Sequence, residues 1–226
     1  MCIRDRSTID YSNNQVVVTT EDGTEYLADK VISTVSVGVL KSNFISFIPT
    51  LPTEKKEAIE SVEFLPGLKL VMKFSQKFYP DVIDCETPIG EKGYYDAAYL
   101  KEAEDHVLAL LSTGISAEEY YQLDNSQAIV EAVLAELDGI FNGAASQFYT
   151  GDYILKDWGQ QVNTLGSWTI PLEDCPEDLK TALDDKVYFA GATYGAIFDV
   201  NNTSNLRGSV QGAITSGYDV VDKILE

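Results

Sequence analysis

The end of the sequence constrains the fold most, because it joins a short apolar strand, a glycine and a long amphipathic helix. Residues 186–191, KVYFAG, form an apolar run that is typical of a buried strand. From Ser209 onward, apolar and small side chains recur at helical spacing, at Val210, Ala213, Ile214, Gly217, Val220, Val221 and Ile224. The polar segment NNTSN lies between the two. The sequence therefore predicts a strand, a turn and a helix at its end.

The start of this helix has the properties of a binding site for negative charge. A helix that begins near Gly208 and Ser209 presents free backbone N–H groups and the positive end of its dipole. Small side chains would let a flat ring or another backbone approach closely, at Gly208, Ser209, Gly212, Ala213, Ser216 and Gly217. A helix that packs tightly through its small residues explains the same pattern equally well.

The middle of the chain predicts a mixed sheet with helices. Residues 67–74 alternate strictly, with Leu68, Leu70, Met72 and Phe74 on one face and Lys69, Val71 and Lys73 on the other. This pattern indicates a half-buried strand. Further strands are expected at residues 94–100 and 107–113. An amphipathic helix is expected at residues 126–141, with Ile129, Val133, Leu137 and Ile140 on one face.

The first third of the chain predicts short strands around a tight turn. Asp22 and Gly23 separate two runs rich in β-branched residues within residues 9–32, which is a hairpin signal. A loop-like passage follows, with prolines at positions 49 and 52. Thr53 is the expected N-cap of a short helix that carries Ala58, Ile59 and Val62 on one face. The fold class predicted from all these elements is α+β.

Composition excludes some classes of function. The 226 residues include 45% hydrophobic ones, enough to build a sizeable core. The formal net charge of −20 disfavours nucleic acid and favours a cationic substrate, although scattered charges also simply confer solubility. No apolar run approaches the roughly 20 residues that span a bilayer, so we expect a soluble chain without a membrane segment. Oligomeric state and compartment are not indicated.

Metal and hydrolytic chemistry have no signature in the sequence. Cys2, Cys85 and Cys175 are far apart and odd in number, which indicates neither a disulfide framework nor a zinc site. The single histidine, His106, precedes an apolar run and is typical of a solvated strand end. We therefore expect no metal and no Ser/His/Asp arrangement.

The amino terminus has an unusual composition. The segment MCIRDR has no apolar core region and so is not a signal peptide. It is also a poor start for the strand pattern that follows. We interpret residues 1–8 as a non-native or truncated start.

Several segments occur in the order found in one enzyme family: VISTVSVGVLK, GLKLVMKFSQKFY, DWGQQVNTLGSW, VYFAGATYG and LRGSVQGAITSG. From about Ile9 to its end, the chain resembles the C-terminal half of the flavin amine oxidases, which include polyamine oxidases, monoamine oxidases and lysine-specific histone demethylases. The resemblance implies that residues 9–49 and 166–226 are the remnant of an FAD-binding α/β domain. Residues 50–165 would then form a substrate-binding domain of mixed sheet with helices.

The resemblance also implies roles at the substrate end. Lys69 matches the lysine that holds a water molecule against flavin N5 and assists reoxidation by oxygen. Trp168 matches an aromatic residue that flanks the substrate amine, and Trp158 matches a tryptophan in the same wall, although either ring also suits a core position. The resemblance further implies that Lys69 points toward Val210.

At the cofactor end, the resemblance places the Val210 N–H against the flavin C2 carbonyl, with Ser209 beside it at the start of the helix. Gly191 and Ala192 would approach the ribityl and pyrophosphate groups. Cofactor contacts from the first segment would come from Thr34, Val35 and Ser36. Ser167 stands where monoamine oxidases carry the cysteine linked to flavin, so noncovalent FAD is expected.

Three departures from the family pattern stand out. Ala192 replaces a glutamate, Ser36 replaces a common proline, and no GxGxxG motif occurs in the chain. In the family that motif binds the ADP part of FAD. We therefore expect this chain, by itself, not to hold FAD tightly.

The implied reaction transfers hydride from an amine α-carbon to flavin N5 and gives an imine and hydrogen peroxide. A polyamine is the preferred substrate, because a polycation suits the acidic surface. Alternatives are a noncatalytic fragment or interaction module, and a related flavoprotein oxidase or desaturase. Lys69 in its strand setting favours an amine oxidase over the related flavoproteins.

Overall fold

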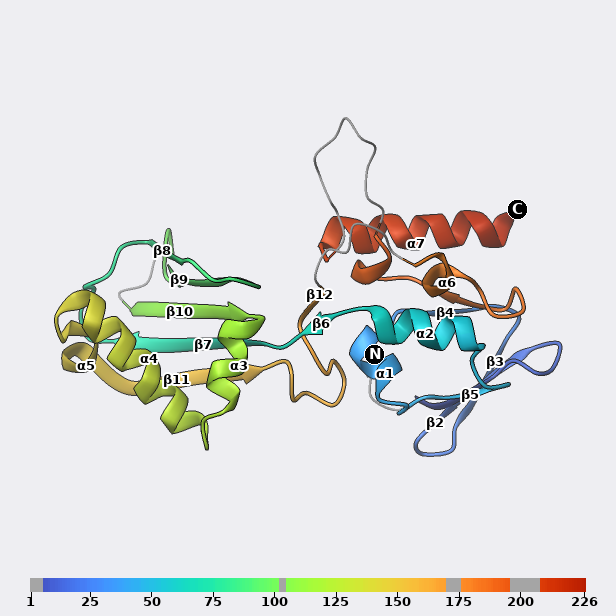
Figure 1. The fold of residues 1–226 in the computed structure, drawn as a ribbon, viewed down its shortest axis with the longest axis horizontal. Coiled ribbons are helices and arrows are strands. Elements are labelled where there is room, and N and C mark those ends of the chain that lie inside the picture. Colours follow the sequence, from blue (N-terminus) through green and yellow to red (C-terminus); the bar gives the residue numbers. More distant parts are fainter. Residues whose placement is uncertain (1–5, 102–104, 170–175, 196–207) are drawn as a thin grey trace. The chain divides into compact units, whose positions relative to one another are not determined.

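The computed structural model describes residues 6–101, 105–169, 176–195 and 208–226 (Figure 1). The polar segment at positions 201–205 and the first five residues lie outside this described part. The chain forms two compact units. Unit 1 comprises residues 1–64, 161–165 and 169–226, and unit 2 comprises residues 65–160 and 166–168. The α+β class expected from the sequence is confirmed, with both helices and sheets present.

Unit 2 is built on one antiparallel sheet of five strands in the order β11-β7-β10-β9-β8. The strands are β7 (Gly67–Phe74), β8 (Val82–Cys85), β9 (Lys92–Asp96), β10 (His106–Thr113) and β11 (Tyr149–Asp157). Strand β7 confirms the predicted alternation, because Leu68, Leu70, Met72 and Phe74 are buried while Lys69, Val71 and Lys73 are partly exposed. The strand predicted at residues 94–100 begins and ends earlier, as β9.

One face of this sheet carries the core of unit 2. The buried face of β7 packs in one cluster with residues of α3 (Ile115–Tyr121), α4 (Ser126–Phe141) and α5 (Ala144–Phe148) (Figure 1). Helix α4 has the predicted bounds and begins at an Asn125 cap, whose side chain accepts a hydrogen bond from Ala128 N at 3.0 Å. Ile129, Val133 and Leu137 are buried as expected, whereas Ile140 in the last turn is 47% exposed.

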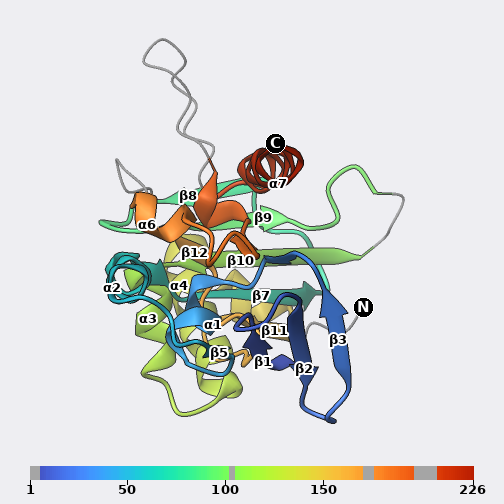
Figure 2. The same cartoon turned by 90° about the vertical axis from the view of Figure 1, so that its right-hand side faces the viewer.

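Unit 1 contains a four-stranded sheet in the order β3-β2-β1-β5 (Figure 2). Its strands are β1 (Arg6–Asp10), β2 (Val16–Thr20), β3 (Glu25–Ala28) and β5 (Ser46–Ile48). The predicted hairpin is confirmed: Gly23 has a φ of +84°, and the Asp22 carboxylate accepts a hydrogen bond from the Thr20 hydroxyl at 2.6 Å. Helix α2 (Thr53–Ser61) buries Ala58 and Ile59, and Val62 beyond it, as expected.

A second, parallel pair of strands leads into the last helix. Strand β13 (Val187–Phe189) pairs with β4 (Val31–Ser33), and the turn η1 (Ala192–Tyr194) follows. Helix α7 (Val210–Leu225) packs Val220 against Tyr188 and Ala190 of the strand segment. The remaining short elements are α1 (Val37–Lys41), α6 (Glu177–Lys180) and the paired strands β6 (Phe64–Leu65) and β12 (Trp168–Thr169). None of the helices in the described ranges is long and apolar enough to cross a bilayer.

The structure corrects the loop expected around Val35, because α1 lies inside it. Ser36 caps this helix by accepting a hydrogen bond from Val39 N at 3.2 Å, and its hydroxyl donates to Thr164 O at 2.6 Å. A Cβ on Gly38 would lie 2.5 Å from the carbonyl oxygen of Leu165, so only glycine allows this close approach. The start predicted for α2 is also wrong by one residue, because Pro52 occupies the N-cap and Thr53 is the first helical residue.

The face that α7 buries coincides only in part with the apolar stripe in its sequence. Figure 2 looks along this helix. The stripe residues Val210 and Ile214 are 73% and 55% exposed, whereas Val220 of the same stripe is buried, together with Gly212 and Ser216. Small residues on this side allow the helix to lie close to the Tyr188 strand. Tight packing through small side chains is therefore realised on one side of α7.

Candidate functional site

Lys69 lies on the face of the unit 2 sheet opposite the α3–α5 helices, which we call the open face. Directly opposite partners in an antiparallel sheet share a face, so Lys69 lies beside Leu111 of β10 and Lys156 of β11. Its ammonium nitrogen lies 5.1 Å from the centre of the Tyr95 ring, at cation–π distance. Lys69 is therefore a half-buried cation held against an aromatic ring, away from the hydrophobic core.

Trp158 stands at the end of β11 next to a second cation. The ammonium nitrogen of Lys156 lies 5.2 Å from the centre of the Trp158 ring, which is 37% exposed. The backbone N–H of Trp158 donates to Gly67 O at 2.9 Å. Gly67 begins β7, so this bond links the tryptophan to the strand of Lys69.

The segment that ends at Trp168 contacts the same region. Gly166 N donates to Trp158 O at 3.1 Å, and Ser167 N donates to Leu65 O at 2.8 Å. A Cβ on Gly67 would lie 2.7 Å from the Ser167 Cβ, so this position must be glycine. Unit 2 therefore brings the Lys69 strand and both predicted tryptophan segments together.

In unit 1, the start of α7 has the geometry predicted for it. The Ser209 hydroxyl caps the helix by accepting a hydrogen bond from Gly212 N at 3.0 Å. Val210 is the first helical residue, so its N–H has no acceptor within the helix. An N–H at this position, together with the helix dipole, suits an electronegative carbonyl oxygen.

The Gly191 turn is linked to α7 by hydrogen bonds. Gly191 N donates to the Ser216 hydroxyl at 2.9 Å, and the same hydroxyl lies 3.0 Å from Gly191 O. Gly208 N donates to Ala192 O at 2.9 Å. Gly191 has a φ of +141°, a conformation that favours glycine, and its missing Cβ leaves the backbone accessible. These hydrogen bonds therefore join the turn and the helix at one edge of unit 1.

The three residues predicted from the first segment have different surroundings. The Thr34 side chain is exposed. The Ser36 hydroxyl is occupied by its bonds to Val39 and Thr164. Val35 lines a cavity of about 530 Å³ within unit 1.

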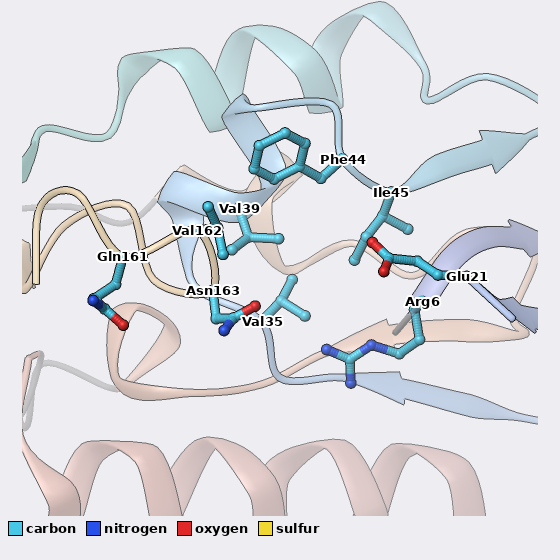
Figure 3. Close-up of a pocket in the computed structure, with 9 residues that line it drawn as sticks. All are labelled: Arg6, Glu21, Val35, Val39, Phe44, Ile45, Gln161, Val162 and Asn163. Atoms are coloured by element: carbon cyan, nitrogen blue, oxygen red, sulfur yellow. The ribbon is translucent and has the colours of Figure 1, made fainter. Parts of the chain in front are cut away.

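Figure 3 shows this cavity. Arg6 and Glu21 lie at one end and the amides of Gln161 and Asn163 at the other, while the apolar wall comes from Val35, Val39, Phe44, Ile45 and Val162. A mostly apolar wall with a few polar groups is typical of a small-molecule site.

The predicted contact between Lys69 and Val210 stays a prediction, because the two residues belong to different units. Sequence reasoning missed Tyr95, Lys156 and Tyr121, whose contacts depend on strand register or on α3. The one available signal was the alternation in residues 154–158, which places Lys156 and Trp158 on one face.

Comparisons with known proteins give a consistent result. A profile of the family described as "Flavin containing amine oxidoreductase" matches residues 5–225. Polyamine oxidase 4 of Oryza sativa subsp. japonica is 34% identical over 215 residues, which are 93% of this chain and 42% of that protein. A probable polyamine oxidase 4 of Arabidopsis thaliana is 32% identical over 213 residues, which are 91% and 40% of the two chains. The chain spans less than half the length of these relatives.

Solved structures share the fold. An engineered variant of putrescine oxidase superimposes with a TM-score of 0.77 at 18% identity, over 98% of this chain and 48% of that one. The wild-type enzyme bound to putrescine gives a TM-score of 0.75 at 17% identity, with the same coverage of each chain. At this level of identity, the likeness concerns the fold alone.

Proposed function

Because this chain belongs to the flavin-containing amine oxidoreductase family, we propose that it supplies the flavin-facing and amine-facing parts of an FAD-dependent amine oxidase. The proposed reaction converts an amine and oxygen into an imine and hydrogen peroxide. Bound flavin supplies the hydride acceptor. The observation that carries the proposal is Lys69, a cation held at 5.1 Å from the Tyr95 ring on the open face of the unit 2 sheet.

The residues at the start of α7 fit a flavin. The Val210 N–H is free of intrahelical partners, and Val210 is 73% exposed. The Gly191 backbone lies in the same unit and is anchored to α7 through Ser216. Hydrogen-bond donors fixed in this way stabilise negative charge without reorganising, which is what a flavin carbonyl requires during reduction.

Noncovalent attachment is part of the proposal. Ser167 occupies the position that the family resemblance assigns to a flavin-linking cysteine. A serine hydroxyl provides no thiol for that linkage. We therefore expect FAD to be released from the protein by denaturation without proteolysis.

In the proposed site, Lys69 holds a water molecule and stabilises the negative charge that develops as oxygen is reduced. Two cations, Lys69 and Lys156, lie on this sheet face with the rings of Tyr95 and Trp158. Such a face disfavours an ammonium group and favours the neutral amine, which is the form that loses hydride. The tryptophan rings exclude water beside it.

We propose a polyamine as the substrate class. Two relatives of this chain carry the name polyamine oxidase, and the net charge of −20 attracts polycations. The amino group that reacts is neutral near Lys69, while the remaining ammonium groups interact with acidic surface. A monoamine of equal length would lack that second interaction.

Replacement of two lysines on one face of β7 tests the proposal. The protein is expressed with FAD, together with any residues encoded upstream of this chain, and carries Lys69→Met or the control Lys73→Met. Lys73 lies on the same face of β7 and pairs with Asp105 at 2.8 Å, so the control removes the same charge nearby.

With spermine as the reductant, stopped-flow spectroscopy separates reduction of the flavin from its reoxidation by oxygen. We expect Lys69→Met to slow reoxidation on the order of 100-fold, as for loss of one charge-stabilising donor, with little change in reduction. Lys73→Met should be close to wild type. Equal reoxidation rates in the two variants would contradict the role of Lys69.

A noncatalytic interaction module is the second candidate. The exposed apolar side chains of α7, at Val210, Ile214 and Tyr218, favour it, because such a surface is typical of a contact with another chain. Peroxide formation by the protein loaded with FAD and given spermine separates the two candidates. A protein that binds FAD and spermine but forms no peroxide would support the module.

A further inference from the structure

The hydroxyl of Tyr121 lies at the point where three segments of unit 2 meet. Tyr121 is the last residue of α3, and its side chain is half-buried. Its hydroxyl oxygen accepts hydrogen bonds from Gly67 N and from Gly159 N, each at 3.2 Å, and donates one to Gly67 O at 3.0 Å. One side chain therefore makes three hydrogen bonds, which join the backbone of two residues that are far apart in the sequence, Gly67 and Gly159.

The two hydrogen bonds between Tyr121 and Gly67 fix the start of β7, the strand that carries Lys69. Gly67 is the first residue of β7, two positions before Lys69. Its carbonyl oxygen accepts from both the Tyr121 hydroxyl and Trp158 N, at 3.0 and 2.9 Å. A shift of Gly67 along the strand would break both bonds, so the position of Lys69 on the sheet depends on them.

The bond to Gly159 fixes the residue that follows Trp158. A Cβ on Gly159 would lie 2.6 Å from the Tyr121 hydroxyl oxygen and 2.8 Å from its ring. Gly159 is not among the glycines with positive φ, so its backbone conformation does not require glycine. The space taken by the Tyr121 ring is what excludes a side chain there. The Tyr121 ring therefore fills the space that a side chain at position 159 would need.

The Trp168 segment is attached to the same place. Ser167 lies against Gly67, where a Cβ would be 2.7 Å from the Ser167 Cβ, and Gly166 N donates to Trp158 O at 3.1 Å. Trp168 is the next residue. All three predicted site residues of unit 2 are therefore one or two positions from backbone that contacts Tyr121 or Gly67.

The protonation of Tyr121 suits this arrangement. Burial, and then the neighbouring Asp157 carboxylate, raise the pKa of the phenol well above its ordinary value. The hydroxyl therefore keeps its proton and can donate to Gly67 O throughout the neutral and mildly alkaline range.

We propose that Tyr121 is a positioning residue that holds Lys69, Trp158 and Trp168 in one arrangement through its bonds to Gly67 and Gly159. This inference rests on the proposed function for its consequence in catalysis, but the positioning itself does not. Phenylalanine at this position would keep the ring and leave the N–H of Gly159 without this acceptor. The two tryptophan segments would then be held less firmly against β7.

The chain has two tryptophans, and both belong to this arrangement, so tryptophan fluorescence reports on it directly. The test compares Tyr121→Phe with the control Tyr120→Phe in the complete chain. Tyr120 is the preceding residue of α3, and its hydroxyl donates to Glu136 at 3.1 Å, away from Gly67 and Gly159. Each variant loses one hydrogen-bonded hydroxyl on the same helix, so loss of stability alone affects both.

We expect Tyr121→Phe to raise the acrylamide quenching constant of the native protein by about twofold, because the tryptophan segments loosen. Tyr120→Phe should leave the constant unchanged. Equal quenching of wild type and Tyr121→Phe would overturn the proposal.

A double-mutant cycle tests the same contact by a different route and remains informative if Tyr121→Phe folds poorly. Gly159→Ala should lower the thermal midpoint when Tyr121 is present, because the new Cβ collides with the ring. The same change should have a much smaller effect in a Tyr121→Ala background. Equal effects in the two backgrounds would show that the ring does not determine the Gly159 position.

The catalytic consequence is tested in the protein loaded with FAD. We expect Tyr121→Phe to lower the rate of flavin reoxidation and kcat/KM for spermine by about tenfold, since small displacements in a site are costly. Tyr120→Phe should change neither. If Lys69→Met has no effect, the proposed function fails, while fluorescence still decides the role of Tyr121. Unchanged quenching in Tyr121→Phe overturns the positioning role whatever Lys69→Met does.

Discussion

The central sheet of unit 2 and the last helix of unit 1 differ in how completely their apolar side chains are covered. In unit 2, helices pack on one face of an antiparallel sheet, and Leu70, Met72 and Leu110 are 0% exposed. In unit 1, α7 buries one narrow side while Val210 and Leu225 are 73% and 78% exposed. An antiparallel sheet is stable with one face covered by helices, because its other face can be polar and solvated.

The parallel pair in unit 1 shows the opposite case. Parallel strands are normally buried on both faces and belong to larger sheets. Strand β13 is fully buried, but Ile32 in the middle of its partner β4 is 39% exposed. Different parts of one chain can therefore differ in stability. Unit 2 should be the stable part of this chain, and the β4–β13 region and α7 the weak part.

The largest expected effect compares one buried leucine with one exposed isoleucine. Leu70→Ala should lower the free energy of unfolding of unit 2 by about 3 kcal/mol, because it leaves a cavity in a packed core. Ile214→Ala in α7 should cost less than about 0.5 kcal/mol, since its side chain is 55% exposed. Urea denaturation followed by circular dichroism measures both. Similar losses in the two variants would remove the distinction between the units.

Hydrogen exchange should show the same difference in stability between the two sheets without any mutation. Backbone amides of β7 and β10 lie in the middle of the five-stranded sheet, whereas β4 and β13 form a pair. We expect protection factors on the order of 100-fold higher in β7 and β10. Mass spectrometry of peptides from each strand gives the values. Equal protection in both sheets would mean that the parallel pair is as stable as the larger sheet.

The exposed side of α7 should bind hydrophobic dyes. Ile214→Glu places a charge on this side and should reduce anilinonaphthalene sulfonate fluorescence about twofold, because a large part of an exposed apolar patch is lost. Gln211→Glu adds the same charge on another exposed position of α7 and serves as the control. An equal reduction in both variants would attribute the effect to charge alone and not to the apolar side.

The smallest expected effect concerns acid stability in unit 2. Burial opposes ionisation of Asp96, but the hydrogen bonds from Lys77 and from Ala98 N hold its pKa below the ordinary value of 3.8. A depressed pKa stabilises the fold above that ordinary value and loses its contribution as pH falls through the native pKa. Lys77→Met should therefore move acid unfolding to a higher pH.

Lys101→Met removes one positive charge at an exposed position and controls for net charge. Acid titration followed by near-ultraviolet circular dichroism compares the two variants. An equal shift would mean that the Lys77 contact with Asp96, at 2.7 Å, contributes nothing specific.

The sequence predicted the elements whose pattern is local and strong. The alternation in Gly67–Phe74, the helical spacing in Ser126–Phe141 and the glycine turn at Gly23 all appear in the structure. Helix α1 was missed because its stability depends on the approach of Gly38 to Leu165, which no local pattern encodes. Strand β11 was missed because a bulge near Gly151 interrupts its alternation.

The candidate site divides in the same way. Lys69, Trp158, Trp168 and the start of α7 were predicted through resemblance to a family, and local chemistry alone would have given a solvated lysine. The predicted stripe of α7 is buried only in part, at Val220 and Ile224, because apolar spacing identifies a stripe but not the partner that covers it. Tyr121 carries no sequence signal, since its role arises from contacts with Gly67 and Gly159.

Our central proposal is that this chain supplies the flavin end of an FAD site, while the ADP end depends on a glycine-rich segment that these 226 residues do not contain. Titration with FAD, followed by flavin fluorescence, tests this claim in the chain alone and in the chain extended by the residues encoded upstream. We predict that only the extended protein binds FAD stoichiometrically at micromolar concentrations. Tight stoichiometric binding by the 226-residue chain itself would contradict the account, because its own residues would then hold the whole cofactor.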